Sequence, residues 1–287
     1  MFKLGVDTMI WVEEFTTQSL PIINKTKELG FDAIDININH PERFPAKEVK
    51  ARLKEVGIEA VTTIGLNKDS NLISPDPAVR KNGEKTMKKM VDINMEIGSK
   101  ICAGVIYAQW GYISGRPRTE AEWNYSVTSM RNICEYAKKQ GDLILAVEPV
   151  NRFETHFLNI AEDAVKYCKE VGTGNIKVHL DTFHMIREEL SYTQAVETCG
   201  KEYLGYVHVC ENNRGIPGTG LVPWKEFFTA LKKIGYNGPA CIESFDPNFE
   251  ETNRLCAIWR KFADSGEELA IKGLKNLKAV QKAVYKT

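Results

Sequence analysis

Eight short apolar runs recur along the chain, and amphipathic stretches of helical length separate them. Strands that alternate with helices form a parallel sheet, because parallel neighbours need crossover connections. Eight such units close into a barrel, and α/β barrels run to about 250 residues or more as one unit. We therefore predict an α/β fold, a single (β/α)8 TIM barrel that occupies residues 1–287 as one domain. The runs lie at 3–9, 33–36, 59–65, 100–105, 143–148, 176–181, 205–209 and 240–243.

Local signals support the helices between these runs. Thr119-x-x-Glu122 is a capping box that predicts a helix start, and Gly141 ends the apolar stripe that follows it. The chain beyond about Pro247 is long for one closing helix, and we expect it to cover the barrel floor or to join a subunit contact. Glycines also follow other expected helices, which is the usual chemistry of αβ loops: Gly30, Gly57, Gly98, Gly172 and Gly235.

Charge and cysteine content limit the class of partner. Lys plus Arg and Asp plus Glu both number 38, so the formal net charge is zero. A nucleic-acid surface needs a cationic stripe, and a neutral chain has no electrostatic reason to bind a membrane. The seven cysteines show no CxxC spacing, which favours reduced cysteine over a disulfide framework. The first residues, MFKLGVDTMIWVEEF, contain no signal peptide or membrane span. We expect a cytoplasmic protein that acts on a small neutral molecule.

Ligand-type side chains stand at the ends of the last four runs. Glu148 ends ILAVE, Asp181 ends IKVHLD, His208 lies in GYVHV and Glu243 lies in ACIES. Each alone fits a structural role, such as a surface charge, a helix N-cap for Asp181 or a core imidazole for His208. Chemistry in this fold sits at the C-terminal ends of the strands. Four such groups would converge there, and a divalent cation would offset the cost of burying their charges.

Three carboxylates and one imidazole form a hard, oxygen-rich ligand set. Such a set suits Mn²⁺, our first choice, with Co²⁺ or Mg²⁺ as alternatives, whereas structural zinc prefers thiolates and several imidazoles. The fifth and eighth strands are three apart around an eight-stranded ring. Glu148 and Glu243 should therefore face each other across the barrel mouth.

Four motifs occur in an order that resembles the ketose 3-epimerase family. They are EPVNRFE at 148–154, DTFH at 181–184, HVCENNRGIPGTG at 208–220 and IESF at 242–245. The family includes D-tagatose, D-allulose (psicose) and L-ribulose 3-epimerases and lies within the xylose-isomerase-like barrels. The resemblance covers nearly the whole chain.

The resemblance implies a metal-dependent isomerase that inverts C3 of a free 2-ketose, such as D-tagatose, D-fructose or D-allulose, or L-ribulose. Glu148 and Glu243 would be the catalytic acid–base pair, working through a cis-enediolate. Together with Asp181 and His208, they would also bind the metal.

Further roles follow from the same resemblance. Glu154, His184 and Arg214 match residues that hold the O1–O3 end of the sugar, and Trp110 matches an aromatic residue near the far end. Relatives are commonly dimers or tetramers, which implies a homodimer or homotetramer.

Two departures from the family pattern concern the preferred sugar. Asp7 stands where some members place an aromatic residue, and strand eight reads ESF where the tagatose and allulose enzymes usually read EPF. The ESF form is nearer to the L-ribulose branch.

Other functions remain open at this point. An aldose–ketose isomerase on the same barrel would use related ligands but move hydrogen between C1 and C2. An endonuclease IV-type nuclease needs a multi-zinc cluster with many histidines, and this chain has only five. A sugar-binding protein without catalysis would not need both Glu148 and Glu243. A phosphorylated substrate is disfavoured because no clear Gly-rich phosphate cradle follows the last two strands, although GIPGTG keeps it open.

Overall fold

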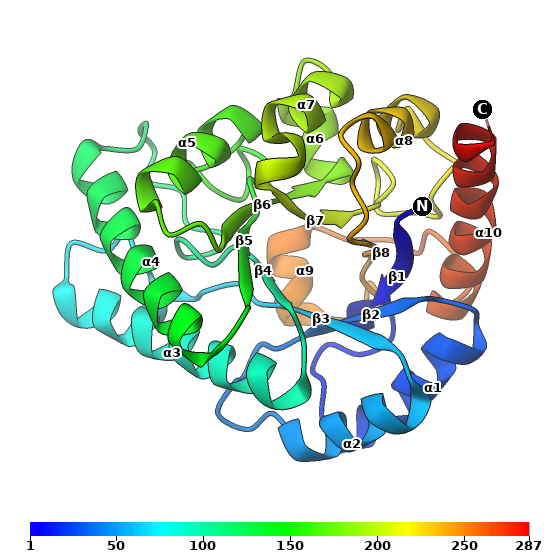
Figure 1. Ribbon diagram of the computed structural model, residues 1–287, viewed down its shortest axis with the longest axis horizontal. Coiled ribbons are helices and arrows are strands. Elements are labelled where there is room, and N and C mark those ends of the chain that lie inside the picture. The colour runs from blue at the N-terminus through cyan, green and yellow to red at the C-terminus, as the bar shows by residue number, and fades with distance from the viewer. Residues whose placement is uncertain (287) are drawn as a thin grey trace.

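A computed structural model describes residues 1–286 and confirms the single (β/α)8 barrel (Figure 1). The sheet closes in the order β1 to β8, and every neighbouring pair is parallel. The strands lie within one or two residues of the predicted runs. They are β1 Lys3–Asp7, β2 Ala33–Asn37, β3 Glu59–Thr63, β4 Ile101–Gly104, β5 Ile144–Val147, β6 Ile176–Asp181, β7 Leu204–His208 and β8 Pro239–Ile242.

Helices surround the barrel, and their ends follow the predicted capping signals (Figure 1). The capping box of Thr119 and Glu122 is present at the start of α4. Gly57 and Gly98 end α2 and α3 in the left-handed region, with φ of 65° and 80°, which a side chain would disfavour. The helices are α1 Pro21–Glu28, α2 Ala46–Val56, α3 Pro77–Ile97, α4 Glu120–Gln140, α5 Ala161–Val171, α6 Thr182–Glu188, α7 Tyr192–Tyr203, α8 Trp224–Lys233, α9 Glu250–Cys256 and α10 Gly266–Tyr285.

Small and aliphatic residues, with one tyrosine, fill the barrel interior. Gly5 has no room for a side chain, because a Cβ there would lie 2.5 Å from Cys241 Sγ. Side chains alternate along a strand, so Glu148 continues the inward face of Ile144 and Ala146. The interior cluster comprises Ala33, Val61, Ile101, Ala103, Ala146, Tyr206 and Cys241, with Ile144 packed against it.

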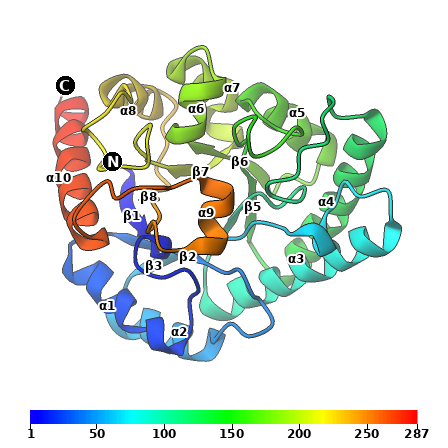
Figure 2. The ribbon, with the colours of Figure 1, turned by 180° about the vertical axis from the view of Figure 1, so that it is seen from behind.

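The segment after β8 covers the barrel mouth, so the expectation that it covers the floor is wrong. Figure 2 shows α9 in front of the strands at this end. The Thr252 amide donates to Glu13 Oε1 in the loop after β1, at 2.9 Å. Cys256 and Ile258 pack in an apolar cluster with Met9, which follows β1. Apolar contacts to the first loop therefore hold the segment over the active end. Helix α10 instead closes the outer ring beside α8.

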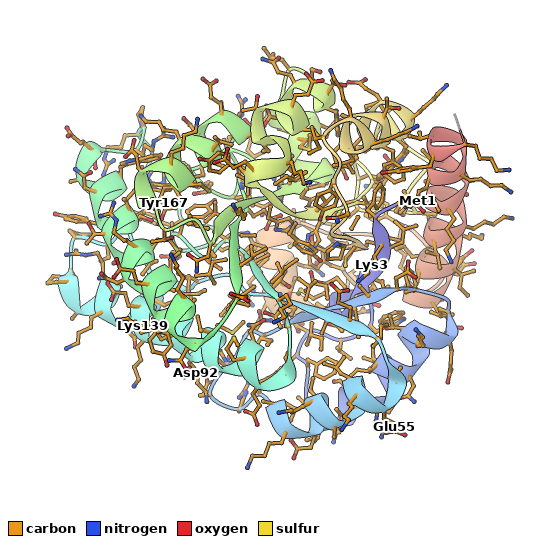
Figure 3. The ribbon with its side chains drawn as sticks, viewed as in Figure 1. Met1, Lys3, Glu55, Asp92, Lys139 and Tyr167 are labelled. Carbon is orange, nitrogen blue, oxygen red and sulfur yellow. The ribbon has the colours of Figure 1, made fainter. Side chains whose placement is uncertain are left out.

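The outer surface carries the charged residues. Glu55 on α2 and Asp92 on α3 lie on the outer helices (Figure 3), whereas Lys3, at the start of β1, forms an ion pair with Glu59 at the N-terminal end of β3. All seven cysteines are buried and unpaired, in agreement with the predicted reduced state. Among residues 1–286, no helix combines the length and apolar character needed to cross a membrane.

The capping box at α4 gives a pH-dependent prediction. Hydrogen bonds from Arg116, together with those from Thr119, lower the pKa of Glu122 to about 2, although burial acts to raise it. A lowered pKa stabilises the fold above the ordinary glutamate pKa, and this stability is lost as pH falls toward the folded-state value. We expect Glu122→Gln to cost about 1–3 kcal/mol at pH 7 and to lower the melting temperature by several degrees. The difference from the parent should shrink below about pH 4.

Glu120→Gln, an exposed residue in the same helical turn, is the matched control and should melt like the parent. A Glu122→Gln protein that also melts like the parent at pH 7 would show that the ionised capping residue adds nothing.

Candidate active site

The last four strands deliver the predicted ligand-type residues to the barrel mouth. Asp181 and His208 are the final residues of β6 and β7, and both are 1% exposed. Glu148 and Glu243 come one residue after β5 and β8. The Glu148 amide still donates to Gly104 of β4 at 3.1 Å, so its backbone continues the strand direction.

These side chains gather into overlapping groups of potential metal ligands. Asp181, His208 and Glu243 each offer a ligand atom within 4.8 Å of the others, and Cys210 belongs to the same group. Glu148 joins Asp181 in a second group and His208 in a third. Asp181 also caps α6 by accepting from the Phe183 amide at 2.8 Å. Asp181 is therefore the N-cap of α6, as the alternative structural role proposed. Its other oxygen, Oδ2, points into the site, where it accepts from Arg214.

An unpartnered nitrogen tests whether a cation fits this group. His208 Nδ1 is buried and makes no hydrogen bond within residues 1–286, although Glu243 Oε2 lies 3.4 Å away. A buried polar atom without a partner is costly. An imidazole lone pair beside the carboxylates of Asp181 and Glu243 suits a divalent cation, so the donor set fits.

Arg214 already brings one positive charge into this group. Its Nη1 donates to Asp181 Oδ2 at 2.7 Å and to Glu243 Oε2, and its guanidinium lies 4.0 Å from the centre of the Phe183 ring. The Arg214 backbone has φ of 62°, which is uncommon for a residue with a side chain. The Ser244 hydroxyl donates to the Arg214 carbonyl at 2.6 Å and helps to hold this conformation.

The departure from proline at position 244 thus has a structural consequence. A proline could not donate the hydrogen bond that Ser244 gives to the Arg214 carbonyl. In this chain the end of β8 therefore fixes the backbone of the loop that carries the active-site arginine.

Glu154, His184 and Trp110 lie on the other side of the site, and Asn151 joins them. Trp110 Nε1 donates to Glu154 Oε2 at 2.7 Å, and Asn151 Nδ2 donates to Glu154 Oε1 at 2.7 Å. The backbone N–H of Asn151 donates to His184 Nδ1 at 3.1 Å. His184 Nε2 then lies 3.7 Å from both Glu148 Oε1 and Asp181 Oδ2.

One small cavity is bordered by most of these residues. Glu148 and Glu243 both line it, and Met9, Gly65 and Phe245 form part of its wall. Gly65 is required there, because a Cβ would lie 2.7 Å from Trp110 Cε3. The cavity is also lined by Trp110, Glu154, His184, His208 and Arg214. The structure therefore brings the predicted site residues to one place. Asp181 does not line the cavity itself but accepts a hydrogen bond from Arg214, which does.

The two glutamates experience opposite electrostatic environments. Burial raises the pKa of Glu148 well above its usual value, and the Glu243 carboxylate raises it further. Burial also acts to raise the pKa of Glu243, but the positive charge of Arg214 acts most strongly in the opposite direction, and that pKa stays well below the usual value. The two carboxyls thus differ in their affinity for a proton.

His179 is a buried histidine beside the site. It is fully buried one layer below Asp181, but neither ring nitrogen makes a hydrogen bond with any described residue. Nδ1 lies 3.6 Å from Glu148 Oε2, and the ring packs edge-on against His208 with centroids 4.3 Å apart. Burial lowers the pKa of His179 well below its usual value, so it contributes a neutral, closely packed ring.

Sequence reasoning missed Asp35, Asn151 and Cys210 as neighbours of the site. Asn151 lies inside the EPVNRFE motif, and Cys210 lies two residues after His208. Asp35 had a usable signal, because it shares the inward face of β2 with Ala33. An acidic residue on an inward strand face needs a partner.

Comparison with known proteins matches this geometry to a family. The model of the xylose isomerase-like TIM barrel family matches residues 23–280. A ketose 3-epimerase of Arthrobacter globiformis is 35% identical over 93% of this chain and 92% of that protein. An L-ribulose 3-epimerase of Methylomonas sp. is 34% identical over 96% of both chains. The crystal structure of a Methylomonas D-allulose 3-epimerase in complex with D-allulose superposes with a TM-score of 0.92. It is 30% identical and covers 97% of this chain and 96% of that one.

The fit of the ligand group to a cation gives a thermal prediction. A cation that binds only the folded state stabilises it by about 2.7 kcal/mol at 100 times its Kd. We expect Mn²⁺ to raise the melting temperature of chelator-treated protein by several degrees, at about 2–4 °C per kcal/mol. Asp181→Asn should abolish the rise, whereas Glu55→Gln, an exposed carboxylate on α2, should leave it intact. An equal rise in the Asp181→Asn protein would contradict binding at this group.

Proposed function

The chain belongs to the xylose isomerase-like TIM barrel family and, within it, to the ketose 3-epimerases. On this basis we propose a mechanism by which it inverts C3 of a free 2-ketose. As a ketose 3-epimerase it is an isomerase. The substrates we propose are ketohexoses or ketopentoses such as D-tagatose, D-fructose or D-allulose, and L-ribulose. This range is supported by the activities of the relatives, which are a ketose 3-epimerase, an L-ribulose 3-epimerase and a D-allulose 3-epimerase.

The observation that carries the mechanism is that Glu148 and Glu243 line one cavity from strands β5 and β8. These strands lie three positions apart in the closed ring, so the two carboxyls approach a bound sugar from different sides. The C3 proton is acidic because it lies next to the C2 carbonyl. One glutamate removes this proton to leave a cis-enediolate, and the other delivers a proton to the opposite face. The configuration of the substrate decides which glutamate acts as the base.

The proposed cation ligands are Glu148, Asp181, His208 and Glu243. Their oxygen-rich set favours Mn²⁺, with Co²⁺ or Mg²⁺ as alternatives. When bound, such a cation supplies a Lewis acid beside the reacting carbonyl. The unpartnered His208 Nδ1 among carboxylates supports this assignment.

The remaining site residues are proposed to hold the sugar. Arg214 and His184 offer N–H donors, and Glu154 offers an acceptor, for the O1–O3 end. Trp110 is proposed to border the far end of the sugar. Its indole also donates to Glu154, so it orients this carboxylate as well. Hydrogen bonds to several hydroxyls fix the position of C3 relative to the two glutamates.

The predicted cytoplasmic location, the homodimer or homotetramer and the extent of the domain over residues 1–287 stay predictions. So does the reading of the ligand as a free sugar without a phosphate.

The two-glutamate mechanism predicts severe loss of turnover in either isosteric variant. A positioned acid or base is worth about 10²–10⁴-fold in rate, so Glu148→Gln and Glu243→Gln should each lower kcat by at least about 10². Epimer formation from a panel of D- and L-ketoses with Mn²⁺ measures this loss and identifies the preferred sugar. The thermal response to Mn²⁺ in each variant separates lost acid–base chemistry from lost cation binding. Glu55→Gln is the control, and activity within about tenfold of the parent in either variant would defeat the mechanism.

Proton exchange gives an independent prediction. In D₂O, deuterium should enter C3 of the product, because the proton delivered comes from a glutamate that exchanges with solvent. Product analysis by NMR measures both the position of the label and the class of sugar. A product without deuterium would indicate a hydride shift. An aldose product would support the alternative function, aldose–ketose isomerisation.

A further inference from the structure

We propose that Asp35 on β2 is a positioning residue for the cation site: it fixes the His208 imidazole so that Nδ1 faces Glu243 and Asp181. The inference rests on the proposed function in one respect only, namely that His208 is a cation ligand. Asp35 itself belongs to none of the sequence motifs, and it reaches the site through His208.

The Asp35 carboxylate is held in place on both oxygens. Oδ2 lies 2.9 Å from His208 Nε2 and accepts from the Tyr206 hydroxyl at 2.5 Å. Oδ1 accepts from Thr63 Oγ1 at 3.0 Å. Asp35 and Tyr206 are 0% exposed, and His208 is 1% exposed. A buried carboxylate with fixed oxygens offers His208 an acceptor at one position.

That acceptor selects one tautomer of His208. An ionised carboxylate can only accept hydrogen bonds, so the ring nitrogen that faces Asp35 must carry a hydrogen. This nitrogen is Nε2. In the neutral ring, Nδ1 then has a free lone pair, and this is the atom that makes no hydrogen bond among residues 1–286 and lies 3.4 Å from Glu243 Oε2.

Ring packing restricts the plane of the His208 imidazole. His179 packs edge-on against His208 with centroids 4.3 Å apart, and the Tyr206 ring lies 5.1 Å away at 70°. The two rings therefore hold the plane of the imidazole, and the contact to Asp35 determines which nitrogen faces the carboxylate. Metal-binding histidines generally donate their second N–H to a carboxylate or carbonyl, which fixes the tautomer and makes the ligand more basic.

Asp7 shows that proximity alone does not produce this role. Asp7 is the register partner of Asp35 on β1 and is also 0% exposed. Its Oδ1 accepts from the Met9 amide at 2.5 Å, and its Oδ2 makes no hydrogen bond within the described residues. His208 is thus bonded to one of two adjacent carboxyls, and Asp7 provides a matched control.

The test measures cation affinity and the His208 tautomer. Titration of the full-length metal-free protein with Mn²⁺, followed by the EPR signal of free Mn²⁺, gives the Kd. Loss of an outer-shell partner typically costs about 10–100-fold in affinity, so Asp35→Ala should bind Mn²⁺ weaker by that factor. Asp35→Asn keeps the shape of the side chain and should fold where alanine does not, with a loss of about tenfold.

The control and the NMR readout decide the role. Asp7→Asn should stay within about threefold of the parent, below the range expected for an outer-shell partner. In ¹⁵N spectra of the metal-free parent, recorded at a pH high enough to leave the ring neutral, His208 should show the Nε2–H tautomer, and the Asp35 variants should lose this preference.

Three outcomes overturn the inference. Parent-like affinity in both Asp35 variants, or an equal loss in Asp7→Asn, would remove the role of Asp35 and leave the proposed function standing. Absence of Mn²⁺ binding by the parent would instead remove the cation from the proposed function, and the inference with it.

Discussion

Burial of like charges at one end of the barrel is the constraint on which the site depends. Asp181, Glu148 and Glu154 are at most 7% exposed, and the Glu243 side chain is 12% exposed. Such charges are stable only when they are paired or bound to a cation. Arg214 supplies one compensating charge, through Asp181 and Glu243. The proposed divalent cation would supply the rest, at the place proposed for the C3 chemistry.

Hydrogen bonds around the barrel mouth hold the loop that carries one of these charged groups in a fixed position. Glu211 accepts from the Gly218 and Val222 amides and from Trp224 Nε1, which fixes the loop between β7 and α8. The same loop carries Arg214, whose backbone conformation Ser244 stabilises from the next strand. Preorganisation of this kind lets charged groups act without reorganising during the reaction.

The two positions that depart from the family pattern, Ser244 and Asp7, have different structural effects. Ser244 gives a hydrogen bond to the arginine loop. Asp7 is a buried carboxyl beside Asp35. Burial raises the pKa of Asp7 well above its usual value, and the Asp35 and Glu243 carboxylates add to this effect. Ser244 thus supports the backbone of the arginine loop, and Asp7 changes the electrostatic environment beside Asp35 and Glu243.

The sequence by itself determined the barrel, the order of its strands and the four residues that end the last strands. These features are local: alternation of apolar runs, capping boxes and terminal glycines follow from neighbours a few residues apart. Only the tertiary structure decided that the segment at α9 covers the mouth, that His179 lacks hydrogen bonds and that Asp35 contacts His208. Asp35 and His208 are 173 residues apart in the chain. Their contact exists because closure of the sheet brings β2 and β7 to face one interior, and no pattern within either strand specifies which partner an inward side chain will meet.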